Sequence, residues 1–276
     1  MFNALRNLTY RRGPASLAPA LRIHGPLKSA YFRLGAPRKR VRANIAGMTA
    51  EFFVRSPSEL RMLERAVQVR NSGASERELI ELFLGAVHRG DTVYDIGANV
   101  GLYTIFLSKR VGPEGHVIAF EPDSRNHLRL QENIQLNGLV NVISFRKALG
   151  DERRIASLFI HKDNPGQSTL LTSQDPRFRE AETVEVVNGD ACRETKGLPV
   201  PRLVKMDVEG YEYSVPHGLR QTLTDPACEF LGCEVHPRSL PPGVTAEHMC
   251  EMLRSFGFDR IEAYARGRER HLACYK

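Results

Sequence analysis

The sequence has no run of eighteen or more apolar residues, so we expect no membrane-spanning helix. Its five cysteines are odd in number and include no C-x-x-C pair, and they therefore support neither a disulfide framework nor a zinc knuckle. Residues 1–20 have no uninterrupted apolar stretch and no convincing cleavage site. We predict a cytoplasmic protein, with a peripheral contact to a membrane as an alternative.

Acidic residues are absent from residues 1–50, which hold ten of the 39 lysines and arginines. The rest of the chain has 29 basic and 32 acidic residues, a net charge of −3, although the whole chain carries +7. The basicity therefore belongs to a predicted N-terminal extension over residues 1–40. Through residues 1–42 the chain could contact an anionic surface, and a solvated tail without a partner is the equal alternative.

Hydrophobic periodicity predicts an α/β fold. Residues 41–56 favour a hairpin around Gly47, and a capping box between Ser75 and Glu78 predicts the start of a helix. Strand and helix patterns then alternate, as is typical of a mostly parallel, doubly wound sheet. The predicted strands are 92–97, 116–122, 141–149, 182–189, 202–208, 228–237, 258–265 and 270–276, the predicted helices are 101–111, 124–138 and 246–257, and 156–173 is a predicted hairpin.

The turn after the first of these strands reads "DIGANVG" and begins at Asp95. It is rich in glycine but is not G-x-G-x-x-G, the turn that presents a helix N-terminus to a pyrophosphate. A carboxylate in this turn would repel a pyrophosphate, so Asp95 favours a ligand with positive charge. S-adenosylmethionine has a sulfonium, an ammonium and no phosphate. The alternative is that Asp95 only caps the turn.

Glu121 ends the second strand, about 20 residues beyond Gly101, the offset at which an acidic residue meets ribose hydroxyls. A carboxylate accepts both hydroxyl protons of a ribose, so Glu121 predicts a nucleoside ligand. The alternative is an exposed acid at a strand end.

The stretch "LVKMDVEGYEY" places Asp207, Glu209 and Glu212 behind a short apolar strand. If the strand persists, Asp207 and Glu209 share one orientation. They could orient an ammonium, remove a proton from a hydroxyl or bind a divalent cation, or Glu209 and Glu212 could simply open the next helix. His236, in "CEVHP", is a candidate general base or a structural histidine. The catalytic candidates are thus Asp207, Glu209 and His236; we assign no metal ligands and leave metal dependence open.

The strings "VYDIGANVGLYTIFLS", "VIAFEP", "KALGD", "LVKMDVEGYE" and "CEVHP", in this order, resemble the FkbM-type methyltransferases. The resemblance covers most of residues 75–240, and the preceding hairpin is also similar. It implies a Rossmann-like class I methyltransferase fold over residues 41–276, S-adenosylmethionine as the donor, and transfer to a hydroxyl oxygen of a sugar, glycan or secondary metabolite.

Carried over residue by residue, the resemblance implies a methionine-side loop after the first strand, a ribose contact after the second and an adenine contact after the third. The candidate cofactor-binding residues are Asp95, Gly97, Ala98, Asn99, Gly101, Glu121, Pro122 and Ala148. The segment "VVNGDACRE" departs from the Leu-Asp-Asp type of segment that related sequences more usually show, so its role is open.

Two other functions stay open. A nucleic-acid (RNA) methyltransferase could grip phosphates with the basic arm, but the fourth strand ends in "MDVEG" and not in the Asn/Asp-Pro-Pro-aromatic motif, which disfavours nucleic acid as a partner. A non-catalytic nucleoside-binding module is the third hypothesis. The oligomeric state is not predicted.

Overall fold

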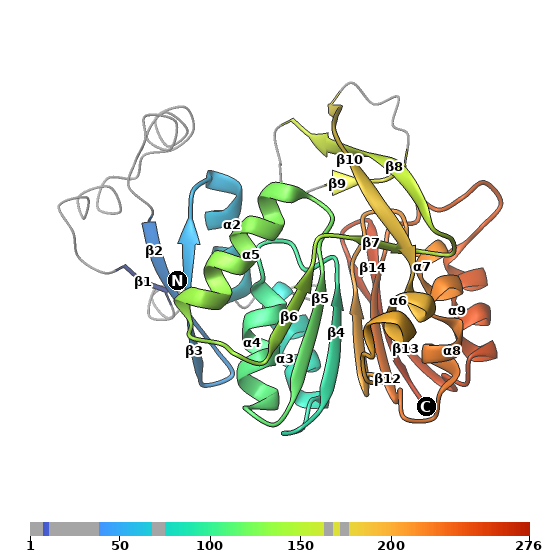
Figure 1. The fold of residues 1–276 in the computed structure, drawn as a ribbon, viewed down its shortest axis with the longest axis horizontal. Helices are drawn as coiled ribbons and strands as arrows, with labels where there is room; N and C mark the ends of the chain where they lie inside the picture. Colours follow the sequence, from blue (N-terminus) through green and yellow to red (C-terminus); the bar gives the residue numbers. More distant parts are fainter. Residues whose placement is uncertain (1–7, 11–38, 68–74, 163–167, 172–176) are drawn as a thin grey trace.

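The computed structural model describes residues 8–10, 39–67, 75–162, 168–171 and 177–276 (Figure 1). A seven-stranded sheet at its centre has the order β13-β14-β12-β11-β4-β5-β6. Only β14 is antiparallel to its neighbours, and the other adjacent pairs are parallel. The predicted α/β class, with a mostly parallel sheet and an antiparallel C-terminal strand, is confirmed. The strands are β4 (Thr92–Ile96), β5 (His116–Phe120), β6 (Val142–Phe145), β11 (Leu203–Met206), β12 (Phe230–Val235), β13 (Arg260–Arg266) and β14 (Glu269–Tyr275).

The strand order reverses beside β4. The chain proceeds outward from β4 to β5 and β6, and then returns to place β11 and β12 on the other side of β4. Ile96 at the end of β4 pairs with Phe120 of β5 and with Met206 of β11, so these three strands end level with one another. In open α/β sheets, ligands bind at such a switch point, beyond the carboxyl ends of the strands.

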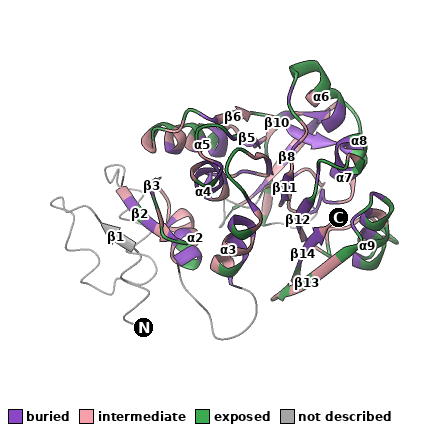
Figure 2. Cartoon of the chain, turned by 90° about the horizontal axis from the view of Figure 1, so that it is seen from below, coloured by how far each residue is buried: buried purple, intermediate pink, exposed green. Residues whose placement is uncertain are grey.

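Helices cover both faces of this sheet, because successive side chains of each strand point to opposite faces. Val93 packs in one core with side chains of α3 and α4, and Tyr94 packs in another with side chains from α6 to α9. Figure 2 shows the buried strands between partly exposed helices. The helices are α2 (Pro57–Val67), α3 (Glu76–Ala86), α4 (Leu102–Val111), α5 (Ser124–Leu136), α6 (Gly189–Lys196), α7 (Ser214–Gly218), α8 (Arg220–Thr224) and α9 (Ala246–Ser255).

The predicted hairpin is present as β2 (Lys39–Ile45) and β3 (Met48–Val54). Strand β1 (Leu8–Tyr10) pairs with β2, while most of the predicted basic extension lies outside the described residues. Two asparagines of the α5 region hold the hairpin: Asn133 Oδ1 accepts from the Phe53 N–H at 2.9 Å, and Asn137 Oδ1 accepts from the Glu51 N–H at 3.0 Å. The extension as a separate segment, and its contact with an anionic surface, stay predictions.

The single strand predicted over residues 141–149 is wrong. The chain leaves the central sheet after Phe145, where β6 is the edge strand, and forms β7 (Ala148–Gly150) in a second sheet. Beyond β6, the first sheet as described has no further strand with which β7 could pair. In the second sheet, β7 pairs with β10 (Phe178–Asn188). This sheet has the order β7-β10-β8-β9, with β8 (Arg154–His161) and β9 (Ser168–Thr169) forming the predicted hairpin. The turn predicted around Asn164 lies outside the described residues.

Among the described helices, none combines the length and the apolar character that crossing a membrane requires.

Candidate active site

The loops that follow β4, β5 and β11 are tied together by backbone hydrogen bonds. The N–H groups of Gly97 and Ala98 donate to the Phe120 carbonyl at 2.9 and 3.0 Å, and the Asp207 N–H donates to the Ile96 carbonyl at 3.0 Å. The three loops predicted to carry the site therefore form one rigid junction.

Gly97 is placed where only glycine fits. Its φ is +78°, and a Cβ added there would lie 1.8 Å from the carbonyl oxygen of Asp207. A side chain at this position would push the first loop away from the end of β11. The glycine-rich turn thus serves a close approach of two backbones as well as any approach of a ligand.

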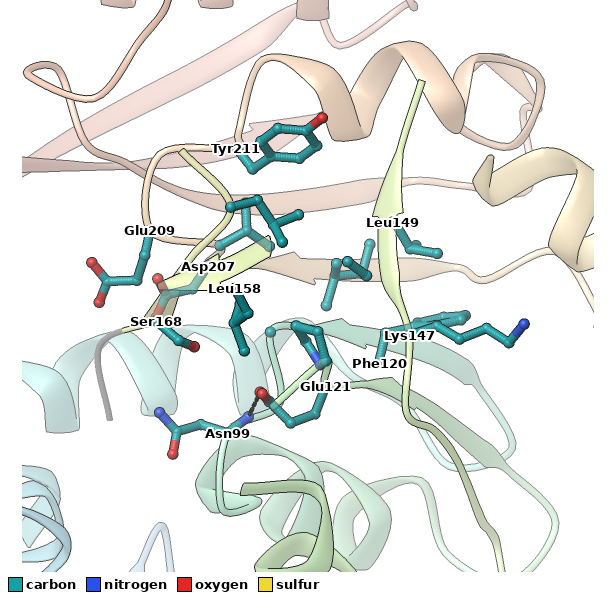
Figure 3. Close-up of a pocket in the computed structure, with 16 residues that line it drawn as sticks. Asn99, Phe120, Glu121, Lys147, Leu149, Leu158, Ser168, Asp207, Glu209 and Tyr211 are labelled. Atoms are coloured by element: carbon teal, nitrogen blue, oxygen red, sulfur yellow. Dashed lines mark hydrogen bonds between the residues drawn. The ribbon is translucent and has the colours of Figure 1, made fainter. Parts of the chain in front are cut away.

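Glu121 occupies the centre of the junction, and its side chain is 3% exposed. Its Oε2 accepts a hydrogen bond from the Asn99 N–H at 2.7 Å, and its Oε1 accepts one from the Asp123 N–H at 2.9 Å (Figure 3). Burial raises the pKa of Glu121 to about 7, against these two hydrogen bonds, which lower it. The alternative of an exposed strand-end acid is therefore wrong.

A small cavity of about 60 Å³ opens beside Glu121. Five of the predicted cofactor-binding residues line it, together with Asp207 and Glu209; the five are Gly97, Asn99, Glu121, Pro122 and Ala148. Figure 3 shows Asn99 and Glu121 on one side of it and Asp207 and Glu209 on the other. Leu158 and Ser168 of the second sheet also line it, together with Leu170, which directly follows β9.

A larger cavity of about 600 Å³ meets the first one. The two share Gly97, Asn99, Asp207 and Glu209, and Ala98 lines only the larger cavity. Its walls come from α2, the start of α3, the first turn of α4 and the β13–β14 turn. Arginines stand on these walls (Arg61, Arg65, Arg266 and Arg268), and carboxylates lie at the end of β11 and in β12.

Asp95 lines neither cavity. It is fully buried, its Oδ2 accepts a hydrogen bond from the Thr104 hydroxyl at 2.5 Å, and its Oδ1 lies 3.2 Å from the Nζ of Lys205. The sequence predicts a positively charged ligand beside Asp95, whereas in the described structure its positive partner is Lys205 of β11. A direct contact between Asp95 and a cofactor stays a prediction, and so does one for Gly101, which packs against Leu130.

Strand β11 ends at Met206, before the acidic motif, so Asp207 and Glu209 do not share an orientation through strand alternation. Glu209 instead takes a left-handed conformation with φ of +50°, and this returns its side chain to the cavity that Asp207 lines. Burial and the neighbouring Asp207 carboxylate raise the pKa of Glu209 above its usual range.

Glu212 does not open the following helix, which begins only at Ser214. Its fully buried Oε1 accepts from the Gly210 N–H at 2.8 Å and lies 2.7 Å from Nδ1 of His236. Burial opposes a charge on His236, but the hydrogen bond with Glu212 and the charges of Glu212, Glu209 and Asp207 outweigh it and raise the pKa of His236 to about 10. A histidine that holds its proton at neutral pH is a poor general base, and His236 lines neither cavity. The arrangement does not favour the base role predicted for it.

The segment "VVNGDACRE" has a structural role. Asn188 caps α6, and the buried Asp190 accepts hydrogen bonds from the Gln221 N–H at 2.7 Å and from the Thr222 N–H at 2.9 Å. No residue of this segment lines either cavity.

Comparison with known proteins decides the family. The Methyltransferase FkbM domain matches residues 95–260, which is more than half of the chain. The chain belongs to the FkbM methyltransferase family. The resemblance read from the sequence is thereby confirmed, and this FkbM protein is an S-adenosylmethionine-dependent methyltransferase with the Rossmann-like fold of that class.

Curated relatives include the hexuronic acid methyltransferase AglP of Haloferax volcanii, which is 28% identical over 77% of this chain and 81% of its own length. Methyltransferase 1 of Beauveria bassiana is 28% identical over 46% of this chain and 57% of its own length. Among solved structures, the SAM-dependent methyltransferase of Agrobacterium tumefaciens is 9% identical, covers 86% of this chain and 70% of its own, and has a TM-score of 0.46.

Proposed function

We propose that this FkbM protein transfers the methyl group of S-adenosylmethionine to a hydroxyl oxygen of a sugar, glycan or secondary metabolite. One observation carries the proposal: the small cavity beside Glu121 and the larger cavity meet at Asp207 and Glu209. A donor in the first and an acceptor in the second would have their reacting atoms at these two carboxylates.

The small cavity suits the nucleoside end of the donor. Glu121 has two carboxylate oxygens that already accept backbone hydrogen bonds and retain lone pairs for ribose hydroxyls. Ala148 and Leu149 give an apolar wall beyond it, as an adenine ring requires. The methionyl end would extend past Gly97 and Asn99 toward the larger cavity.

S-adenosylmethionine supplies an activated methyl group, so the protein has mainly to align the acceptor with it. Positioning of this kind contributes about 7–11 kcal/mol in favourable cases. Asp207 is the carboxylate that we assign to take the hydroxyl proton, because it lines both cavities and because Glu209, the other carboxylate there, has a pKa raised to about 8. Proton removal by a positioned base adds roughly 10²–10⁴-fold.

The larger cavity supports a polar acceptor. Arginines and carboxylates on its walls offer both hydrogen-bond donors and acceptors, which suits a molecule with several hydroxyl groups. The similarity to a hexuronic acid methyltransferase supports a sugar or sugar acid as the first class to test.

The test is methyl transfer by the full chain from isotopically labelled S-adenosylmethionine to a panel of neutral sugars, uronic acids and macrolide-type alcohols. Mass spectrometry detects the product, and NMR distinguishes a methyl ether from a methyl ester or an N-methyl group. We expect a methyl ether on at least one panel member. Transfer only to a carboxylate or to nitrogen would refute the proposed chemistry, and transfer only to RNA would replace it with the nucleic-acid alternative.

The variant Asp207→Asn separates proton removal from cofactor binding. We expect it to lower kcat by at least 100-fold with little change in the Kd of S-adenosylmethionine, because the amide cannot take the proton. Glu251→Gln, at an exposed position of α9 and outside both cavities, is the matched control and should leave both values unchanged.

A further inference from the structure

Behind the junction of the two cavities lies a cluster of carboxylates and imidazoles from the β11 loop, β12 and β14. In one subset, a carboxylate oxygen of Asp207, a carboxylate oxygen of Glu209 and a ring nitrogen of His236 all lie within 4.8 Å of one another. Glu234, Glu269 and His271 are their neighbours. The proposed methyl transfer uses at most one carboxylate of this cluster, so the rest of it requires another explanation.

The spacing of the donor atoms is that of ligands around one cation. Nε2 of His236 lies 3.3 Å from Oε2 of Glu209 and 3.9 Å from Oε1 of Glu234. Donor atoms held at about 2.1 Å from a common metal are separated by roughly 3.0–4.2 Å in tetrahedral or octahedral geometry. The side chains would therefore need little rearrangement to share a metal ion.

The carboxylates of the cluster outnumber its described cations, which are His236 and Arg266. A metal ion bound at Nε2 would replace the proton of His236. Arg266 is the described arginine that reaches the cluster, with Nη2 3.5 Å from Oε1 of Glu234 and 3.5 Å from Oε2 of Glu269. Among the described residues, no lysine or arginine forms an ion pair with Asp207 or Glu209. Several partly buried carboxylates at this spacing repel one another unless a positive charge lies between them.

Two further observations point to a metal. His271 is 7% exposed, and its Nε2 has no hydrogen-bond partner although it points toward the cluster, 3.5 Å from Oε1 of Glu234. The other ring nitrogen of His236, Nδ1, lies 2.7 Å from the buried carboxylate of Glu212, which aims Nε2 at Glu209. Histidines that bind metals almost always donate the second ring N–H to a carboxylate, a backbone carbonyl or water.

We propose that Asp207, Glu209 and His236 bind a divalent transition-metal cation, with Glu234 beside it as a fourth donor. Imidazole together with carboxylate favours Mn²⁺ or Zn²⁺ over Mg²⁺ or Ca²⁺, which prefer all-oxygen sites. The larger cavity gives the ion a path, because both Asp207 and Glu209 line it. A role in the reaction, in which the cation binds and polarises an acceptor hydroxyl, rests on the proposed function; the binding itself does not.

The test uses the full chain freed of metal with a chelator and then dialysed. Mn²⁺ is titrated in, and the loss of the EPR signal of free Mn²⁺ measures binding without any methyl acceptor. We expect one Mn²⁺ per chain, displaced by stoichiometric Zn²⁺ and not by the same concentration of Ca²⁺. Absence of binding at millimolar Mn²⁺, or equal displacement by Ca²⁺, overturns the proposal.

Two isosteric variants locate the site. Glu209→Gln should weaken Mn²⁺ binding at least tenfold. Because the Glu209 side chain is partly exposed, the thermal unfolding of this variant in the presence of chelator should match that of the wild type. Glu251→Gln, the matched control at an exposed position of α9 outside the cluster, should change the Kd less than threefold. The reverse pattern, or equal binding by wild type and Glu209→Gln, overturns the assignment.

The competing role of these carboxylates is to hold the ammonium group of the cofactor. Adding S-adenosylhomocysteine, which has that ammonium, should leave Mn²⁺ bound in the EPR titration. Release of one Mn²⁺ for each S-adenosylhomocysteine bound would show that the carboxylates bind the cofactor and would overturn the metal site. The proposed methyl transfer would not be affected by this result.

Discussion

The Nζ of Lys205 lies 3.2 Å from Oδ1 of Asp95, and both side chains are almost completely buried. Lys205 also donates to the Gly97 carbonyl at 2.8 Å and lies over the Tyr103 ring, 5.1 Å from its centroid. Burial opposes the charge on Lys205, but the adjacent Asp95 and Asp207 carboxylates outweigh it and raise the pKa of Lys205. One ion pair thus joins β4, β11 and the first loop of the site.

Lys205→Met should reduce the free energy of unfolding by about 3–5 kcal/mol, because it leaves the Asp95 carboxylate buried without a cation. Adding Asp95→Asn to this variant removes the stranded charge and should restore part of the loss. Urea unfolding of the wild type, both single variants and the double variant measures the coupling. Strictly additive effects would show that the two groups do not stabilise each other.

Gly97→Ala and Gly47→Ala form a matched pair of substitutions. Both glycines have positive φ, +78° and +77°, but an added Cβ meets the Asp207 carbonyl at Gly97 and nothing within 4 Å at Gly47. We expect Gly47→Ala to cost about 1–2 kcal/mol of unfolding free energy from backbone strain alone. Gly97→Ala should cost clearly more and also weaken S-adenosylmethionine binding. Equal losses in chemical denaturation would mean that the close approach of the two loops is not required.

The sequence was sufficient for the order and type of most elements, since the strand and helix patterns from Thr92 onward are strongly periodic. It also predicted that Glu121 and Asp207 lie at one edge of the sheet, because residues after parallel strands meet there, and both line the small cavity. It failed at residues 141–149, where the switch from β6 to β7 depends on pairing with β10, some forty residues later. The local hydrophobic pattern does not identify a pairing strand so far away in the sequence.

Asp95 and Lys205 show a second kind of limit. The sequence predicted a positively charged ligand beside Asp95, but a lysine of the chain can pair with a buried carboxylate equally well. A lysine within the short buried strand "LVKM" was the available signal, because such a lysine is rarely buried without an acidic partner. Similarly, the left-handed turn at Glu209 has no signature before Gly210, so strand alternation gave an unreliable reason for placing Glu209 beside Asp207.

Glu121→Gln should weaken S-adenosylmethionine binding about 10- to 100-fold, because hydrogen bonds to a charged group are worth roughly 1.5–3 kcal/mol. The amide keeps the size of the side chain but accepts through only one oxygen. Calorimetric titration of the wild type, Glu121→Gln and the remote control Glu251→Gln measures the difference. A Kd unchanged in Glu121→Gln would remove Glu121 from the ribose contact.

Binding of S-adenosylmethionine should also depend on pH through Glu121. Its pKa is raised to about 7, so the carboxylate that accepts ribose hydroxyls is lost progressively below neutral pH. We expect the affinity to fall by up to tenfold per pH unit below about pH 7 and to level off above it. Calorimetry at several pH values in wild type and Glu121→Gln isolates the effect, since the variant should lack this component of the pH profile.

The stability of the ligand-free protein should show the opposite trend. Because the folded pKa of Glu121 lies above its usual value of 4.5, the folded state holds this proton more firmly than the unfolded state does. The resulting stability is complete below about pH 4.5 and is lost as the pH rises through 7, by on the order of 3 kcal/mol. Glu121→Gln cannot ionise, so relative to this variant the wild type should become less stable between about pH 5 and pH 8. Parallel urea titrations across this range measure the difference, and a constant offset between the two proteins would show that burial does not hold a proton on Glu121.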